Sequence, residues 1–246
     1  MRFRLVVILV LSVTSIIGIG ALPTSAGRTL YPDLKTRPPR DLSFAQRDDV
    51  GWVLRFTNTV ANVGQGPLEL QGDPNTSAGE EHPIFQNFYD ADGILTESKQ
   101  VATDTTYHAE HNHYHFTDFG ASVLLERKAG SNRYRATSMT GAKTSFCIED
   151  VVEDLGEGDS EQTYTECGTD LQGLTPGWSD IYASDLWGQW IVIGDKPLAD
   201  GKYGLKSTVD PLNLLDEGAK KREKNNSAIT YFTVTNGVIR NVRDEP

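Results

Sequence analysis

Four of the five histidines in the chain lie within one short stretch, Tyr107 to Phe119, which reads YHAEHNHYHFTDF. Three of them, His111, His113 and His115, alternate as H-x-H-x-H. Because side chains i, i+2 and i+4 of a β-strand point to the same face, three imidazoles at this spacing can bind one metal ion. Three neutral histidines also leave coordination positions open for water or substrate, which is typical of catalytic sites. The spacing alone predicts zinc, with hydrolysis, or copper, with oxidation by dioxygen.

The fourth histidine of the stretch, His108, has the opposite strand parity from these three. Its spacing leaves two roles open: it orients a ligand through a hydrogen bond, or it simply precedes the strand. A cupin-like site would need a glutamate a few residues after the second histidine, and Phe119 and Gly120 stand there instead. A chance cluster of surface histidines is the plain alternative, which the rarity of histidine elsewhere in the chain disfavours.

The elements that must position these residues have the pattern of short strands. Alternating, β-branched or aromatic segments bounded by turn residues predict strands at residues 52–60, 84–89, 119–127, 133–137, 144–148, 186–193, 203–210, 228–235 and 238–242. The last two form a hairpin across Asn236-Gly237, and the histidine strand bends into the next strand at Gly120. Residues 27–48 are expected to be an extended lead-in, and residues 168–178 a loop. No segment has a sustained helical period, so we expect an all-β, single-domain, β-sandwich-like core with long irregular loops and little helix.

The N-terminus has the pattern of a secretory signal peptide. Two arginines precede an apolar run at residues 5–22, and Pro23 and small residues follow it as far as Ala26. We therefore predict a cleaved leader at 1–26 and one catalytic domain at 27–246; an uncleaved membrane anchor is the alternative. No second apolar run of that length exists, so the mature protein is expected to be secreted or extracytoplasmic, with no stable membrane span after cleavage.

Charge and cysteine content narrow the function further. The formal net charge is −11, which argues against nucleic acid as a partner and would attract cationic substrates. The two cysteines, Cys147 and Cys167, are expected to form a disulfide in an exported protein. The segment between them is rich in acidic residues but lacks the spacing of a calcium-binding loop, so a solvated loop is favoured over a calcium site.

Several segments together resemble one known family. His108 to Phe119 is similar to the copper-binding stretch of the lysyl oxidases. Gly141 to Asp150 (GAKTSFCIED) and Gln172 to Tyr182 (QGLTPGWSDIY) resemble the segments around the family's quinone-forming lysine and tyrosine. Shorter matches stand in the family's order on either side, so that the resemblance extends roughly from Leu30 to Val234.

The resemblance implies a copper amine oxidase. His111, His113 and His115 would bind Cu²⁺, and Lys143 and Tyr182 would become lysyl tyrosylquinone, a cofactor built from the chain itself. Such an enzyme converts primary amines, either peptidyl lysine or small amines, to aldehydes with dioxygen, releasing hydrogen peroxide and ammonia. The quinone acts as an electrophile and electron sink, and a protein base removes a proton from the substrate.

The same resemblance implies roles for further residues, and at some positions the sequence departs from the family pattern. Asp180 and Asp185 flank Tyr182 and are candidates for the base, and the cysteine pair matches one family bridge. Tyr107 and Glu110 stand where animal members have Trp and Cys, which favours a microbial secreted homologue over an enzyme for collagen or elastin.

Two further function classes remain as alternatives. A non-catalytic secreted β-sandwich could keep the histidines as a metal-binding module without forming the quinone, and a zinc hydrolase would use the same three ligands. The joint presence of Lys143 and Tyr182 favours the enzyme over the binding module. His108 is assigned to an outer position that supports the metal ligands.

Overall fold

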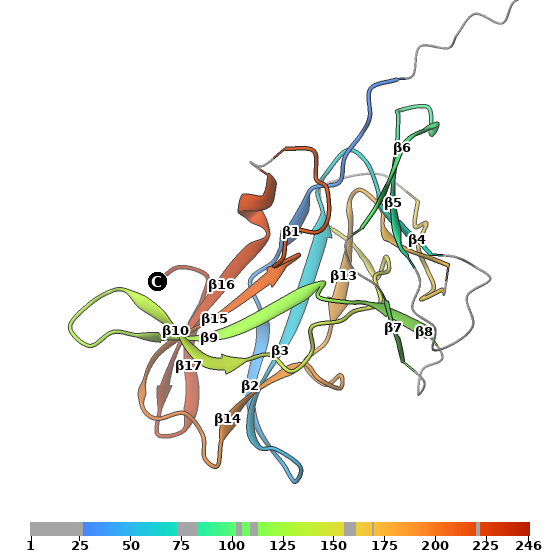
Figure 1. Ribbon diagram of the computed structural model, residues 1–246. Coiled ribbons are helices and arrows are strands. Elements are labelled where there is room, and N and C mark those ends of the chain that lie inside the picture. Colours follow the sequence, from blue (N-terminus) through green and yellow to red (C-terminus); the bar gives the residue numbers. More distant parts are fainter. Residues whose placement is uncertain are drawn as a thin grey trace, which may run out of the picture.

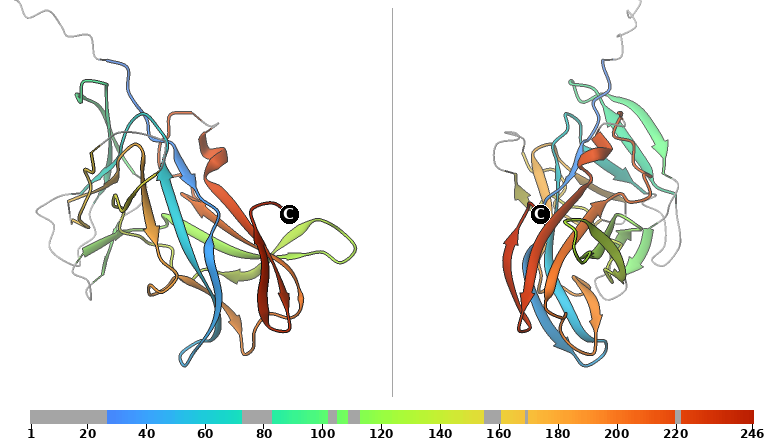
Figure 2. Two further views of the ribbon diagram at one scale, coloured as in Figure 1. Left: turned by 180° about the vertical axis from the view of Figure 1, so that it is seen from behind. Right: turned by 90° about the vertical axis from the view of Figure 1, so that its left-hand side faces the viewer.

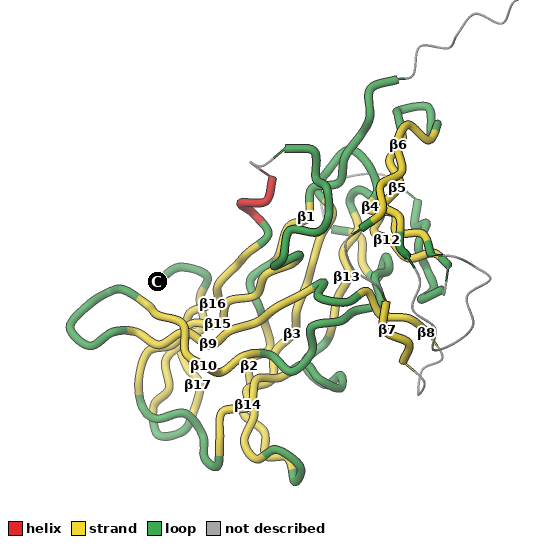
Figure 3. The backbone as a smooth tube through the Cα atoms, in the orientation of Figure 1, coloured by secondary structure: helices red, strands yellow, loops and turns green. Residues whose placement is uncertain are grey.

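The computed structural model describes residues 27–72, 83–101, 105–108, 113–154, 161–168, 170–219 and 222–246, with the backbone alone at 105–108 and 113–114. Regular structure in these residues is almost entirely antiparallel β-sheet (Figures 1 and 3). A short 3-10 turn, η1 (Arg222–Asn225), is the one helical element of the described chain. The predicted all-β class with little helix is therefore confirmed. No helix within these ranges is long and apolar enough to span a membrane, and the predicted leader lies outside them.

The central sheet has six strands arranged around one long strand, β3 (Gly51–Asn62). The first half of β3 pairs with β2 (Arg40–Arg47) and β14 (Trp190–Gly194). Its second half pairs with β1 (Leu34–Thr36) and β13 (Trp178–Tyr182), and β13 also pairs with β11 (Val152–Glu153). Because β3 has 12 residues, it is long enough to pair with two neighbours along its first half and with two others along its second half.

Two further sheets and a hairpin complete the fold. The five-stranded sheet has the order β10 (Tyr134–Thr140), β9 (Gly120–Arg127), β15 (Gly201–Val209), β16 (Ser227–Thr235) and β17 (Val238–Arg243). The four-stranded sheet has the order β12 (Leu171–Leu174), β4 (Leu68–Gln71), β5 (Phe85–Tyr89) and β6 (Leu95–Gln100). The hairpin consists of β7 (Thr105–His108) and β8 (His113–Phe116). It lies at the end of the molecule opposite the β9–β10 turn (Figures 1 and 2).

The cores follow from strand alternation. Leu54 and Phe56 of β3 face Leu124 of β9, Leu205 of β15 and Phe232 of β16, all of them buried. This layer packs the six-stranded sheet against the five-stranded sheet, as in a β-sandwich. A second buried cluster, the second core, lies between β1, β3, β4 and β12 and includes Phe116 of β8 and Phe119, which follows β8. The candidate site borders this second cluster.

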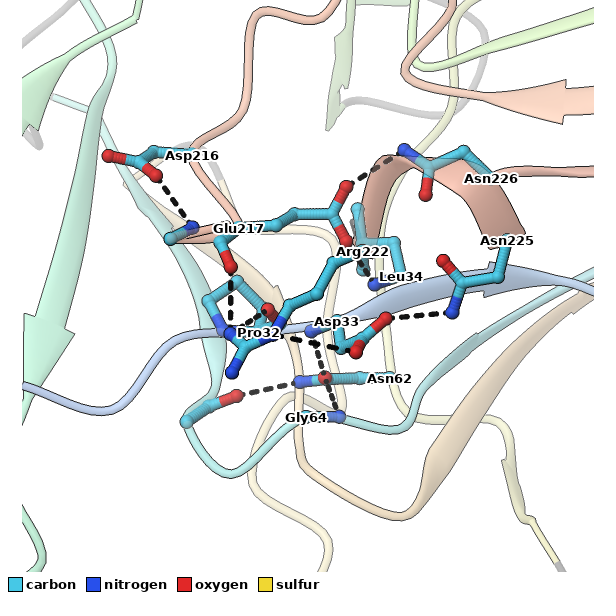
Figure 4. Close-up of polar contacts among 12 residues, drawn as sticks. Pro32, Asp33, Leu34, Asn62, Gly64, Asp216, Glu217, Arg222, Asn225 and Asn226 are labelled. Carbon is cyan, nitrogen blue, oxygen red and sulfur yellow. Dashed lines mark hydrogen bonds and ion pairs between the residues drawn. The ribbon is translucent and has the colours of Figure 1, made fainter. Parts of the chain in front are cut away.

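A buried polar cluster fixes β1 to the chain around η1 (Figure 4). The Glu217 carboxylate accepts hydrogen bonds from the Leu34 amide at 2.5 Å and the Asn226 side chain at 2.8 Å. Asp33 lies 3.5 Å from the Arg222 guanidinium. Burial raises the pKa of Glu217 to about 7, against the hydrogen bonds that it accepts. These contacts join residues 33–34 to residues 217–226, next to the second core, to which Leu34 belongs.

Several sequence-based expectations are wrong in detail. Residues 144–148 do not form a strand; they make one β-bridge, between Phe116 and Phe146. Residues 168–178 are not all loop, because they contain β12. Gly173 permits this strand, since a Cβ there would lie 2.4 Å from the Leu68 carbonyl oxygen and 2.7 Å from the Tyr164 ring. The lead-in at 27–48 is extended as expected, but it is also paired, because it contains β1 and β2. The bend after the histidine strand occurs at Asp118, where φ is 57°, and not at Gly120.

The predicted disulfide between Cys147 and Cys167 is present. Within the loop that it closes, Asp150 is only 2% exposed. Its carboxylate accepts hydrogen bonds from the backbone amides of Thr163, Tyr164 and Thr175, at 2.7–3.0 Å. This carboxylate therefore serves the fold of the loop, because it satisfies buried amides that have no strand partner.

Candidate active site

Tyr182 and Asp180 share one face of β13. In the ladder with β3, Asp180 is opposite Val60 and Tyr182 is opposite Asn58. Since strand side chains alternate, Trp178 lies on the same face, and Trp178 and Tyr182 both pack against the second core. Asp180, between these two aromatic residues, is 2% exposed. The sheet thus carries a phenol and a carboxyl group into an apolar environment.

Lys143 reaches the same place from a segment without regular structure. Ala142 donates a hydrogen bond to the Trp190 carbonyl at 3.1 Å, and Gly141 donates one to the Ser122 carbonyl at 2.8 Å. These bonds hold the segment between β9 and β14. The Lys143 ammonium nitrogen then lies 5.2 Å from the centroid of the Tyr182 ring. The two residues assigned to the quinone from the resemblance are therefore neighbours in space.

The loop after Tyr182 closes over the Lys143 side chain. Gly188 has a φ of +80°, and a Cβ there would lie 3.1 Å from the Lys143 Cβ. Arg55 of β3 donates hydrogen bonds to the backbone carbonyls of Ser184 at 2.5 Å and Leu186 at 3.0 Å. Asp185, the second candidate base, is exposed in this loop. The loop is fixed by backbone contacts, and its glycine makes room for the lysine.

The Tyr182 hydroxyl donates a hydrogen bond to the Cys147 carbonyl. The Tyr182 ring meets the Phe146 ring edge to face, with centroids 4.7 Å apart. Burial raises the pKa of Tyr182 well above its ordinary value, and the nearby Asp180 and Glu149 carboxylates raise it further. The phenol is therefore held protonated and in one orientation.

The charges at the site strongly perturb one another. Burial raises the pKa of Asp180 well above its ordinary value; Glu149 adds to this effect and Lys143 opposes it. Neither oxygen of the Asp180 carboxyl has a hydrogen-bond partner among the described residues. Burial also lowers the pKa of Lys143, against the attraction of Asp180. A carboxyl group with a high pKa and an amine with a low pKa are the forms that proton transfer and nucleophilic addition need at neutral pH.

The histidine strand joins this site through aromatic packing. Phe116, the last residue of β8, exchanges two backbone hydrogen bonds with Phe146, at 2.7 and 3.1 Å. Phe119 bridges the rings of these two residues, with centroids 6.2 and 6.0 Å away. Phe146 in turn contacts Tyr182. A continuous row of rings therefore leads from β8 to the candidate quinone residues.

The candidate metal ligands are only partly described. His113 and His115 belong to β8, and the β7–β8 ladder pairs His108 with His113. His115 is 8% exposed. His111 lies outside the described residues. The three-histidine copper site and the supporting role of His108 stay predictions.

Sequence reasoning missed several residues that shape the site. Phe146 forms the ring contacts, Gly188 makes room for Lys143, and Glu149 adds charge near Asp180. Phe146 and Glu149 both lie within the GAKTSFCIED segment, so the resemblance contained a signal for them. For Gly188, a lone glycine in a chain with 23 glycines, there was no such signal.

Comparison with known proteins identifies the family. The family model for lysyl oxidase matches residues 85–241, which is more than half of the chain. Protein-lysine 6-oxidases are 38% identical over 112 residues in Rattus norvegicus, 42% over 113 in Gallus gallus and 39% over 113 in Homo sapiens. Each alignment covers 45% of this chain and 24–25% of the relative, so the match spans about a quarter of those proteins. On the extent of the family match, this chain belongs to the lysyl oxidase family.

Proposed function

We propose that this protein is a secreted, copper-dependent amine oxidase of the protein-lysine 6-oxidase type. The observation that carries the proposal is the approach of the Lys143 ammonium nitrogen to within 5.2 Å of the Tyr182 ring centroid. Its substrates would be primary amines, either lysine side chains of proteins or small amines, together with dioxygen. Family membership and the relatives named protein-lysine 6-oxidase support it.

The surroundings of Lys143 and Tyr182 fit the formation of lysyl tyrosylquinone. The lysine amine must add to the oxidised tyrosine ring as a neutral nucleophile, and burial lowers the pKa of Lys143 in that direction. The Phe146 ring and the Cys147 carbonyl hold the tyrosine ring and its hydroxyl in place. Gly188 leaves space against the lysine side chain. These contacts therefore limit the motion of Lys143 and Tyr182 before the two side chains join.

His111, His113 and His115 would hold copper, since imidazole nitrogens suit Cu²⁺ and three of them leave positions open. Bound copper and the quinone supply the oxidation: a primary amine loses two electrons and two protons to dioxygen, giving hydrogen peroxide, and water then releases ammonia and leaves the aldehyde. The two backbone hydrogen bonds between Phe116 and Phe146 support this copper assignment, because they join the histidine strand to the residue that contacts Tyr182.

Asp180 is the base that the geometry favours. It lies on the same strand face as Tyr182, and burial makes its carboxylate a stronger proton acceptor than a carboxylate in water. Asp185 is exposed and lacks this enclosure. We assign to Asp180 the removal of a proton from the substrate carbon that bears the amine. The net charge of −11 would attract the cationic substrate to the enzyme.

Replacement of the lysine tests the amine oxidase activity. Copper-loaded wild-type protein should release hydrogen peroxide with a primary amine or with peptidyl lysine, and Lys143→Arg should release none, because a guanidinium does not add to the ring. Lys196→Arg, at an exposed lysine far along the chain, is the matched control and should keep the wild-type rate. Peroxide release by Lys143→Arg would contradict the assignment. No peroxide from wild type with any amine would favour the non-catalytic metal-binding module.

Replacement of the carboxyl group tests the base. Asp180→Asn keeps the size of the side chain but cannot accept the proton, so kcat should fall by about 10²- to 10⁴-fold. The amine oxidation step should then show a larger isotope effect with substrate deuterated at the carbon that bears the amine. Asp185→Asn should have little effect on kcat. A wild-type rate in Asp180→Asn would exclude this residue as the base.

The variant Asp180→Asn also tests how Asp180 affects the stability of the protein as pH changes. The pKa of Asp180 in the folded state is raised above the value of about 3.9 expected in the unfolded chain. Ionisation therefore favours unfolding, and wild type should lose stability relative to Asp180→Asn as pH rises from about 4 toward the folded-state pKa. Urea unfolding across this pH range measures the difference between the two proteins. A difference that stays constant with pH would mean that Asp180 is not an isolated buried carboxyl group.

A further inference from the structure

A second feature of the molecule has no part in the proposed amine chemistry. It is a hollow of about 170 Å³ on the five-stranded sheet, lined by Arg127, Asn132, Tyr134, Lys202, Arg243 and Pro246. Its lining residues come from the β9–β10 hairpin, β15 and the C-terminal end of the chain. The turn of that hairpin lies at the opposite end of the molecule from the β7–β8 hairpin (Figures 1 and 2). Any ligand of this hollow would therefore bind far from the candidate metal site.

The strand register explains why these side chains converge. Tyr134 of β10 is directly opposite Arg127 of β9. The ladder of β9 with β15 ends at the pair Glu126 and Tyr203, so that Lys202 of β15 follows next to Arg127. Neighbouring residues of adjacent strands lie on one face of a sheet. Three strands thus place an aromatic ring, a guanidinium and an ammonium group side by side, and β17 adds Arg243.

The lining offers hydrogen-bond donors. Arg127 donates from Nε to the Ser131 carbonyl at 2.6 Å and from a terminal nitrogen to the Asn132 side-chain oxygen. These bonds fix the guanidinium, and they occupy the acceptor oxygen of Asn132, which leaves its NH₂ group as the free end of the amide. Lys202 and Arg243 form no ion pair with any carboxylate in the described part of the chain.

The charge of the lining is unusual for this protein. Three cationic side chains gather in one small hollow of a chain whose net charge is −11, and Pro246, the last residue of the sequence, brings one carboxylate to the same lining. Asp244 and Glu245 follow Arg243 in sequence, but neither lines the hollow. Like charges at short distance repel one another, and an anion between them would relieve that repulsion. The Tyr134 ring packs on Tyr231 at a centroid distance of 4.8 Å and gives the hollow a firm wall.

We propose that this hollow binds a phosphate or sulfate group, either as the free ion or as an ester on an anionic polymer. Guanidinium groups match the oxygens of tetrahedral oxyanions in paired hydrogen bonds, and lysine adds a point charge. The volume is below the range of about 300–1,000 Å³ typical of drug-sized ligands, which suits one such group. An enzyme held on a polymer by this face would keep the β7–β8 end turned away from the polymer. The inference does not depend on the proposed amine oxidase activity.

Calorimetric titration with inorganic phosphate and with sulfate at low salt tests the site. Wild type should bind, and Lys202→Gln/Arg243→Gln should bind at least about tenfold more weakly, since each charge-assisted hydrogen bond contributes substantially. The matched control is Arg40→Gln/Lys196→Gln, which removes the same charge from exposed positions outside the hollow. It should bind as wild type does, and all three proteins should release peroxide at the same rate.

Polyphosphate and a sulfated polysaccharide distinguish the two sources of the anion. Binding of a polymer much more tightly than the free ion, and its loss in the Lys202→Gln/Arg243→Gln variant, would assign the site to polymer-borne esters. Equal affinity for polymer and ion, again lost in that variant, would assign it to the free anion. Absence of binding by wild type, or an equal loss in the pocket and control variants, would overturn the proposal.

Discussion

The pairing of β13 with β3 is the constraint on which the candidate site depends. It places Asp180 opposite Val60 and Tyr182 opposite Asn58, with both polar groups on the side of the second core. A shift of the ladder by one residue would turn both side chains to the other face. Their raised pKa values, the edge-to-face contact of Tyr182 with Phe146 and the approach of Lys143 all follow from this register.

The segment that carries Lys143 has little regular structure and is held by individual contacts. Its start bonds to β14 and β9, Phe146 bonds to β8, and the Cys147 carbonyl accepts the Tyr182 hydroxyl. The disulfide of Cys147 and the hydrogen bonds of Asp150 fix the chain beyond. An irregular segment allows the Lys143 and Phe146 side chains and the Cys147 carbonyl to face one tyrosine. In a regular strand the side chains of Lys143 and Phe146, three residues apart, would point to opposite faces.

Part of this arrangement could be predicted from the sequence, and the reasons are specific. The alternation of residues 52–60 and the Asn236-Gly237 turn predicted β3 and the β16–β17 hairpin, because a half-buried strand and a tight turn have local signatures. β12 could not be found in this way, since Gly173 is required by its close contact with Leu68 and Tyr164, which lie elsewhere in the sequence. The roles of Lys143 and Tyr182 came from resemblance alone. The lack of a hydrogen-bond partner for the Asp180 carboxyl group among the described residues depends on the tertiary fold. The neighbours of Asp180 in sequence do not determine which hydrogen-bonding groups lie near it.

The central claim is that Lys143 and Tyr182 form one cofactor, and peptide mass spectrometry of copper-loaded protein tests it most directly. A protease digest should yield a cross-linked species that contains the peptides of both residues, at the mass of the oxidised tyrosine joined to the lysine nitrogen. Protein prepared without copper should yield the two peptides separately, and adding copper and dioxygen should convert them to the cross-linked species. Recovery of Lys143 and Tyr182 only in separate, unmodified peptides after copper loading in air would contradict the account.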